Sequence, residues 1–271
     1  MPLLSYFSDI PYTGGCGICS LQDLDLDAQT MQNVQKKCAG ACSAAVVLFP
    51  YLVRDTGNLS QYARGKDYHV VVLQALEDVC RNLRADFPAH TFVPLTDASP
   101  LPEVRAAWIS GAGILGKNGL IFDREYGSYV FIGTVLTDLP AQTTPSDRAV
   151  CPDCGACRRA CPAGALNDGQ VDTACCLSDL TQSKKPLTEE QTELLRNHPL
   201  IWGCDICSQV CPLNKKAKET PNPAFREQRI CSLSPEDVEG LTRRQFLEKY
   251  PERAFTWRGP APLVRNLSLK R

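Results

Sequence analysis

The residues best suited to chemistry in this chain are its cysteines, of which there are 15 in 271 residues. Four of them form the run Cys151-x2-Cys154-x2-Cys157-x3-Cys161, which is followed by Pro162. This is the spacing of the bacterial ferredoxin run, in which three thiolates bind one [4Fe-4S] cluster and the fourth binds another. Zinc sites more often show paired Cys-x2-Cys or His ligands. The run therefore predicts iron–sulfur clusters, and we expect Cys161 to begin a helix that points away from the first one.

A second group, Cys204-x2-Cys207-x3-Cys211, is also followed by proline but lacks the first cysteine of the run, because Ile201 stands there. The missing ligand must come from elsewhere, and Cys175 and Cys176 are the nearby sources. The crossing of the fourth thiolate then predicts two sets of ligands. The first set is Cys151, Cys154, Cys157 and Cys211, and the second is Cys161, Cys204, Cys207 and one of the adjacent pair, for which we favour Cys176.

The N-terminal cysteines allow a different metal site. Cys16-x2-Cys19 and Cys38-x3-Cys42 together could supply the four thiolates of a zinc site. However, the stretch from Cys16 to Leu21 is typical of a strand, which would direct Cys16 and Cys19 to opposite faces. We therefore favour buried packing roles for these thiols.

The elements that must position these residues divide the chain into three parts, and the fold class expected is α+β. Residues 1–145 form a mixed α/β unit, residues 146–214 a ferredoxin-like unit for two clusters, and residues 215–271 a short helical segment. Residues 140–146 resemble a linker. Residues 70–73 are typical of a strand, but the stretch 71–83 fits a helix equally well, and we favour a helix there. Apolar patterning further predicts strands at 46–49 and 129–136, and helices at 102–110 and 188–197.

Charge is distributed unevenly along the chain. The formal net charge is −1, yet residues 213–271 carry 13 Lys and Arg against 7 Asp and Glu. A basic end could attract a polyanion such as RNA, or it could simply be a solvated surface. The basic positions that cluster there are Lys215, Lys216, Lys218, Arg243, Arg244, Arg265, Lys270 and Arg271.

Neither secretion nor membrane insertion is indicated. The first six residues lack a basic segment followed by an apolar one. The longest apolar run, at 44–53, contains Pro50 and is far shorter than the roughly 20 residues that span a bilayer. We therefore expect a cytoplasmic protein without a membrane segment, in a compartment where its cysteines stay reduced.

Two further motifs look functional but are incomplete. Gly111-x4-Gly116-Lys117 resembles a phosphate-binding loop, but Asn118 replaces the Ser or Thr that would bind magnesium, which argues against nucleotide hydrolysis. Asp67-x-His69 is similar to the histidine loop of base-off corrinoid enzymes, but Val72 stands where its glycine is expected. We interpret His69 as a structural histidine.

Several short motifs, taken in order, resemble the epoxyqueuosine reductases, which are cobalamin-dependent iron–sulfur enzymes of tRNA modification. Residues 62–69 (YARGKDYH) are similar to YAxGxDYH of that family, and Thr96-Asp97 through Glu103 to its V-D-x-A-P-x-x-E. Residues 113–118 are similar to GWxGK, and 176–181 (CLSDLT) to CISYLT, which favours Cys176 as the eighth ligand. Three matches remain: residues 124–128 taken together with 137–140, residues 203–212, and the pair Arg265-Asn266. The substituted positions are Ile114, Tyr129 and Asp179.

The resemblance implies a short form of the family, without its C-terminal helical repeats. It implies a base-off cobalamin between the α/β domain and the ferredoxin-like domain, fed with electrons by two [4Fe-4S] clusters. Co(I) would reduce the epoxide of epoxyqueuosine to the alkene of queuosine in the anticodon stem-loop of tRNA. An electron donor such as a flavodoxin or a ferredoxin is implied as a partner. The residues implied to line the corrinoid are Tyr62, Lys117, Asn118 and Ser128.

Asp97 matches the family's proton donor. Removal of an epoxide oxygen needs two electrons and protonation of a developing alkoxide, and a carboxyl group buried enough to stay protonated suits that step. Taken alone, Asp97 could instead be a helix N-cap ahead of Pro102. Two other functions are consistent with the sequence: a divergent corrinoid reductase of a small molecule, and a ferredoxin-like electron carrier without a corrinoid.

Overall fold

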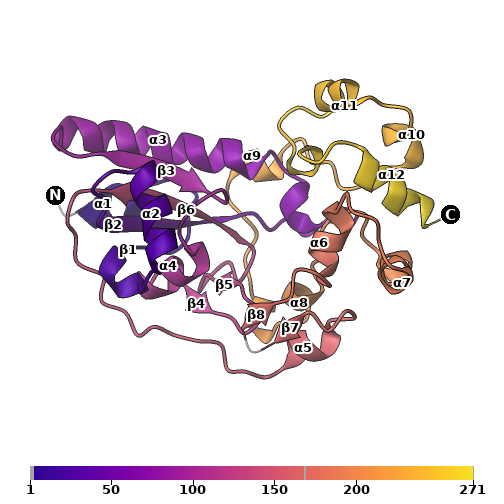
Figure 1. Ribbon diagram of the computed structural model, residues 1–271, viewed down its shortest axis with the longest axis horizontal. Coiled ribbons are helices and arrows are strands. Elements are labelled where there is room, and N and C mark those ends of the chain that lie inside the picture. The colour runs from indigo at the N-terminus through magenta and orange to yellow at the C-terminus, as the bar shows by residue number, and fades with distance from the viewer. Residues whose placement is uncertain (1–2, 168, 271) are drawn as a thin grey trace.

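A four-stranded antiparallel sheet forms the centre of the larger part of the molecule, and the predicted α+β class is confirmed (Figure 1). The computed structural model describes residues 3–167 and 169–270. The strand order is β1-β2-β6-β3. The strands are β1 (Cys16–Ser20), β2 (Ser43–Pro50), β3 (Phe92–Thr96) and β6 (Val130–Thr137). The strands expected at 46–49 and 129–136 therefore lie in β2 and β6.

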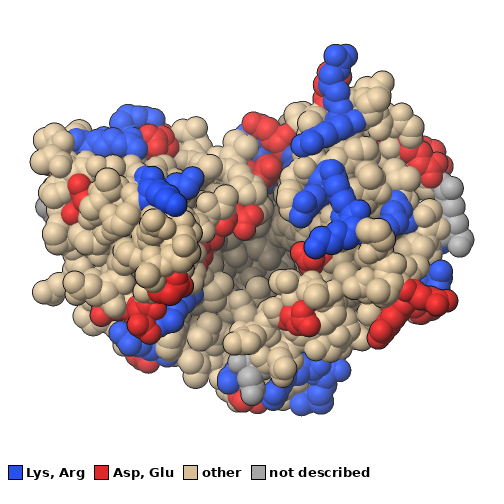
Figure 2. Space-filling view, viewed as in Figure 1, with Lys and Arg blue, Asp and Glu red and all other residues tan. Residues whose placement is uncertain are grey.

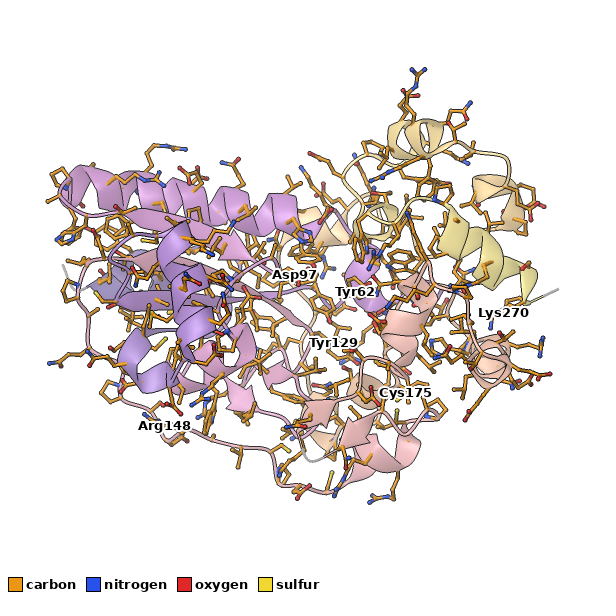
Figure 3. All side chains as sticks on the ribbon, in the orientation of Figure 1. Tyr62, Asp97, Tyr129, Arg148, Cys175 and Lys270 are labelled. Carbon is orange, nitrogen blue, oxygen red and sulfur yellow. The ribbon has the colours of Figure 1, made fainter. Side chains whose placement is uncertain are left out.

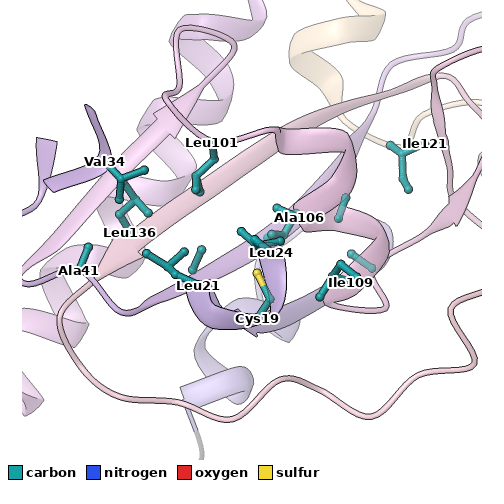
Figure 4. Packing of buried hydrophobic residues seen from close by; sticks show 14 of the residues in the cluster. Cys19, Leu21, Leu24, Val34, Ala41, Leu101, Ala106, Ile109, Ile121 and Leu136 are labelled. Carbon is teal, nitrogen blue, oxygen red and sulfur yellow. The ribbon is translucent and has the colours of Figure 1, made fainter. Parts of the chain in front are cut away.

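Helices cover both faces of this sheet. The central strand β2 is therefore buried along its whole length. Its residues 44, 46 and 48 pack with one core, which includes α2 (Ala28–Lys37) and α4 (Glu103–Ile109) (Figure 4). Residues 45, 47 and 49 pack with a second core, which includes α1 (Leu3–Ser8) and α3 (Tyr68–Asp86). This alternation is the two-residue period of a strand. The stretch 70–83 lies within α3, so the helix prediction is confirmed.

The linker expected at 140–146 runs along the outer edge of β1. The Thr144 amide donates to the Ile18 carbonyl at 2.8 Å, and the Thr144 hydroxyl accepts from the Ile18 amide at 2.9 Å. The Thr143 hydroxyl also accepts from the Ser20 amide at 2.9 Å. The segment therefore covers an edge strand whose backbone groups would otherwise be unpaired.

The cysteine-rich unit is built from short elements joined by loops. The hairpin of β4 (Ile114–Leu115) and β5 (Ile121–Phe122) contacts it, since the Cys151 amide donates to the Leu115 carbonyl. The helix expected at 188–197 is present as α7. One local prediction is wrong: Cys161 ends α5 rather than beginning a helix, because its amide closes the last turn on Cys157 and Arg158. The elements here are α5 (Ala156–Ala160), β7 (Leu166–Asn167), β8 (Gln170–Val171), α6 (Leu177–Gln182), α7 (Glu189–Asn197), α8 (Ile206–Gln209) and η3 (Pro212–Asn214).

The C-terminal segment returns to both other parts rather than standing alone. Leu59 and Ala63 form a core with Trp202 and residues of the C-terminal helices. Phe225 packs into the sheet core beside Phe131. The three-part division stays a prediction. The core around Trp202 joins residues of all three parts. The elements are α9 (Pro223–Arg226), α10 (Pro235–Val238), α11 (Arg243–Lys249), η4 (Ala254–Thr256) and α12 (Ala261–Ser268), with η2 (Gln61–Ala63) from the first part.

None of the helices in the described part of the chain is long and apolar enough to cross a membrane. On the face seen in Figure 2, a hollow separates the sheet domain from the C-terminal helices, and Lys and Arg side chains gather on the C-terminal side. Two of the expected basic residues form hydrogen bonds with backbone carbonyls of the protein itself. Arg265 donates to the backbone carbonyls of Leu180 and Ser183, and Lys270 to those at the end of α7. Arg271 lies outside the described residues.

Candidate active site

Asp97 stands directly after β3, where the chain turns sharply toward α4. Its φ is +59°, a conformation that costs energy for a residue with a side chain. The Asp97 carboxylate accepts from the Tyr68 hydroxyl at 2.7 Å and lies 3.4 Å from His69 Nε2. The N-cap of α4 is Pro102, so the helix-cap alternative for Asp97 is wrong. The strained turn directs the carboxylate toward the first turn of α3.

His69 is fixed between two carboxylates. Asp67 caps α3 by accepting from the His69 amide at 3.0 Å, and the same oxygen lies 2.8 Å from His69 Nδ1. The other ring nitrogen faces Asp97. Hydrogen bonds to Asp67 and then Asp97 raise the pKa of His69 to about 9, so the ring is protonated at neutral pH. The structural interpretation of His69 therefore misses its contact with the predicted proton donor.

The protonation expected of Asp97 is not what its surroundings favour. The side chain is 64% exposed, and its hydrogen bond with His69 lowers the pKa of the carboxyl despite partial burial, as does that with Tyr68. Glu103 has the opposite environment. Burial, and then the charge of Asp97, raise the pKa of Glu103 to about 8. The carboxyl that stays protonated at neutral pH is therefore Glu103, which the sequence reasoning included in a motif without giving it a role.

A cavity of about 380 Å³ joins these groups to the cysteine-rich unit. Aromatic side chains from separate segments line it, among them Tyr62, and Figure 3 labels Tyr62 and Asp97, which both line this cavity. Its size is within the range of ligand sites, and its wall is mainly apolar. Of the predicted corrinoid contacts, the cavity brings together Tyr62, Asn118 and Ser128 with Asp97.

Asn118 and Ser128, two of these predicted contacts, differ in their hydrogen bonds. The Asn118 Nδ2 is buried and has no hydrogen-bond partner in the described part of the chain. The Ser128 hydroxyl is already paired, since it accepts from Asn214 at 2.8 Å and lies 3.1 Å from the Ser208 hydroxyl. Lys117 does not line this cavity; its backbone amide donates to Cys151 Sγ at 3.3 Å. The structure thus places Lys117 with the first set of thiols.

The eight predicted ligand cysteines fall around two separate hollows. Cys161, Cys176, Cys204 and Cys207 line the main cavity. Cys151, Cys154, Cys157 and Cys211 line a smaller one beside Gly116 and Lys117. Each set combines cysteines of both sequence groups, as the crossing rule predicts.

Cys175 and Cys176 have different surroundings, although they are adjacent. Cys175 Sγ donates to the Asp172 carbonyl at 3.6 Å and does not line the cavity, whereas Cys176 is the N-cap residue of α6 and does. Burial raises the pKa of Cys204 to about 12 and that of Cys207 to about 11. Binding of metal to these thiols must therefore release protons.

The N-terminal cysteines do not converge. Cys19 packs in the core on the α4 side of the sheet, and Cys16 against the core on the α3 side. Across the described residues, no three Cys, His, Asp or Glu side chains are arranged to hold a single metal ion. The placement of Cys16 and Cys19 against opposite faces of the sheet agrees with the packing interpretation. Cys231, which the sequence reasoning left aside, donates to Asp55 at 3.0 Å.

Asp205 is a further residue that sequence reasoning missed. It lies between Cys204 and Cys207, is 6% exposed and accepts from the Gln61 amide at 2.9 Å and from the Ser60 hydroxyl. It therefore ties the second cysteine group to the segment that carries Tyr62. Its position inside the Cys-x2-Cys motif was the only sequence signal available.

The fold and the two sets of cysteines define a protein with a binding domain for two [4Fe-4S] clusters. A family model described as a 4Fe-4S double cluster binding domain matches residues 150–214, and one described as epoxyqueuosine reductase QueG, DUF1730, matches residues 32–98. The chain belongs to the epoxyqueuosine reductase family.

Curated relatives show how much of the family's length is present. An epoxyqueuosine reductase of Lactococcus garvieae is 33% identical over 221 residues, which cover 78% of this chain and 60% of that protein. One from Bacillus subtilis is 29% identical over 266 residues, covering 93% and 68%. The chain therefore spans less than two thirds of the length of the Lactococcus relative.

Solved structures extend the likeness to almost the whole chain. An epoxyqueuosine reductase from Bacillus subtilis, described with its catalytic aspartate loop swung out of the active site, has a TM-score of 0.84 at 25% identity. An epoxyqueuosine reductase with an epoxyqueuosine-modified tRNA-Tyr stem loop has a TM-score of 0.81 at 25% identity. In both cases 99% of this chain and 79% of the other are covered.

Proposed function

We propose that this protein reduces epoxyqueuosine in tRNA to queuosine, using a base-off cobalamin and two [4Fe-4S] clusters. One observation carries the proposal: a single cavity is lined by Asp97, Tyr68 and Glu103 and also by four of the predicted ligand thiols. A redox reaction that also consumes protons needs both kinds of group beside one substrate.

The residues of the cavity fit a corrinoid in chemical character. A mainly apolar wall with Tyr51, Tyr62 and Tyr68 suits the face of a large ring. The Asn118 Nδ2, buried without a partner among the described residues, can donate to an amide at the ring edge. When bound, the cobalamin would supply a strongly reducing cobalt centre.

The chain's own residues have three tasks in this proposal. The two sets of thiolates bind the clusters, and backbone amides that donate to Cys151 and Cys161 stabilise negative charge on sulfur. The tyrosines exclude water from the reacting epoxide. Asp97 and His69 together hold one proton, which Asp97 delivers to the oxygen that leaves the carbon atoms.

The surface supports tRNA as the substrate. Arg258 lies over the exposed ring of Trp257, with its guanidinium carbon 3.7 Å from the ring centroid, and Arg243, which begins α11 with Arg244, lies near Gly259 of the same segment. Cationic and aromatic side chains together suit unpaired nucleotides of a loop. A small low-potential protein, a flavodoxin or a ferredoxin, would supply two electrons one at a time.

The test is reduction of epoxyqueuosine-containing tRNA by the anaerobically reconstituted protein with a strong reductant, followed by mass spectrometry of the nucleosides. We expect loss of one oxygen from the modified base with wild type and a large loss of rate with Asp97→Asn. Asp78→Asn, on the exposed surface of α3, is the matched control and should react as wild type.

Full iron and cobalt loading without turnover would contradict the proposed substrate. Retention of iron and sulfide without any corrinoid would instead support the electron-carrier alternative.

A further inference from the structure

Glu103 is a carboxyl group of the cavity to which the proposed mechanism gives no task. It begins α4 and lines the cavity together with Asp97. Its Oε1 is buried and has no hydrogen-bond partner among the described residues. Asp97 lies near enough for its charge to raise the pKa of the Glu103 carboxyl. Glu103 therefore shares the cavity with Asp97 and has one buried oxygen without a partner among the described residues.

Asp97 and Glu103, which line one cavity, do not favour the same protonation state. A buried carboxylate without a partner is costly, and a second negative charge nearby increases that cost. Asp97 has cationic His69 beside it and is largely exposed, so the negative charge is placed there at lower cost. Opposed environments of this kind separate an acid from an ionised partner.

Other charged groups around α4 do not offset this arrangement. The groups that act on Glu103 are Asp97, which raises its pKa, and His69, which lowers it. The core packed against α4 is apolar, and its titratable groups are Cys19, Cys38 and Tyr126; burial raises the pKa of each, that of Cys19 to about 12. The acidic residues of η1 (Leu21–Leu24) and its cap are directed elsewhere: Asp23 accepts from Thr143 and Asp25 faces Arg105.

The chemistry of the proposed function requires two protons. Both C–O bonds of the epoxide break, a C=C bond forms, and the oxygen leaves as water, so the reaction consumes two electrons and two protons. A low-potential protein donor supplies the electrons through the clusters. The Asp97–His69 pair holds only one of the protons.

We propose that Glu103 is the second acid of this site, a neutral carboxylic acid in the resting protein that supplies the other proton consumed in each deoxygenation. The inference rests on the proposed function for the use of the proton, but the presence of the proton is a property of the protein alone. The two statements can therefore be tested separately.

Infrared difference spectroscopy on the reconstituted protein tests the proton directly. We expect a carbonyl stretch of a protonated carboxylic acid that persists at neutral pH and disappears on titration near pH 8. Glu103→Gln should abolish the band, whereas Glu77→Gln, an exposed control on α3 paired with Arg84, should leave it. Asp97→Asn should shift the titration to lower pH, because it removes the neighbouring negative charge.

Single-turnover rates test whether the proton is used. Glu103→Gln keeps the shape and the hydrogen-bond acceptor of the side chain, so a purely structural role predicts a wild-type rate. Proton supply predicts a fall of about a hundredfold at pH 7. It also predicts loss of the decline near pH 8, leaving the decline near pH 9 from His69.

The outcomes separate the inference from the function on which it rests. A band that titrates as described in a protein without epoxyqueuosine turnover would refute the proposed function but support the neutral Glu103. Absence of the band, or an unchanged rate and pH profile in Glu103→Gln, would overturn the inference even if wild type reduces the tRNA. Should Glu103→Gln fail to fold, the shift in Asp97→Asn decides the protonation state.

Discussion

Replacement of Gly203 by alanine should disturb the site where the sheet domain meets the second cysteine group. Gly203 precedes Cys204 and has a φ of +74°. A Cβ atom there would lie 2.4 Å from Ser60 Cβ and 2.9 Å from Tyr62 Cε1. The backbone has little freedom to withdraw, because the Gly203 amide donates to Thr181 at 2.8 Å and its carbonyl lies 3.1 Å from His198 Nε2.

The expected cost has two parts. The left-handed conformation costs an alanine about 1–2 kcal/mol. Forced overpacking against Ser60 and Tyr62 adds about 1–3 kcal/mol. Gly164 provides a matched control in the same unit, since its φ is +59° and no atom lies within 4 Å of an added Cβ. Gly164→Ala should therefore incur only the first cost.

Anaerobic denaturation of the reconstituted protein measures this difference, with cluster absorbance and far-ultraviolet circular dichroism followed together. Gly203→Ala should be less stable than Gly164→Ala by about 1–3 kcal/mol. It should also lose iron first from the set that contains Cys204. Equal stability and equal iron content in the two variants would refute the close approach of Ser60 and Tyr62 as the cause.

Three further predictions concern single contacts. The ion pairs of protonated His69 with Asp67 and Asp97 stabilise the folded protein by about 1 kcal/mol after solvent screening. This contribution is fully present below pH 6.5 and is lost as pH rises through about 9. The free energies of unfolding of wild type and His69→Gln should therefore converge across that range. Cys176→Ser should remove about half of the bound iron, as expected for one of two equal clusters, whereas Cys175→Ser should retain it, by iron and sulfide analysis. Asp55→Asn should lower the free energy of unfolding by about 3 kcal/mol, because it leaves buried Arg64 without its carboxylate; a change within error in chemical denaturation would contradict this.

The two sets of thiols were predictable because cluster ligands obey local spacing rules. In a ferredoxin run, three ligands of one cluster come from a single short loop, so Cys151, Cys154 and Cys157 form a recognisable pattern. Only the choice between Cys175 and Cys176 required more than spacing, and the family motif favoured the residue that lines the cavity.

The strand at 92–96 escaped sequence reasoning for a physical reason. Pro94 lies inside β3, and proline argues against a central strand. β3 is an edge strand that pairs only with β6, so its proline does not interrupt a second ladder. Edge position is a property of topology, which this sequence alone does not reveal.

The acid–base groups were harder to predict than the thiols because their chemistry depends on pairing across elements. His69 lies in the first turn of α3, Asp97 follows β3 and Glu103 begins α4. One sequence motif holds Asp97 and Glu103, but it does not join them to His69. The resemblance led us to expect that Asp97, the family's proton donor, is the protonated carboxyl. The contacts in the structure favour Glu103 instead. The hydrogen bond with His69 keeps Asp97 ionised, and Glu103 is neutral because it is buried and, in addition, because Asp97 carries a negative charge. Removal of His69 should therefore alter both carboxyl groups, although it contacts only one of them.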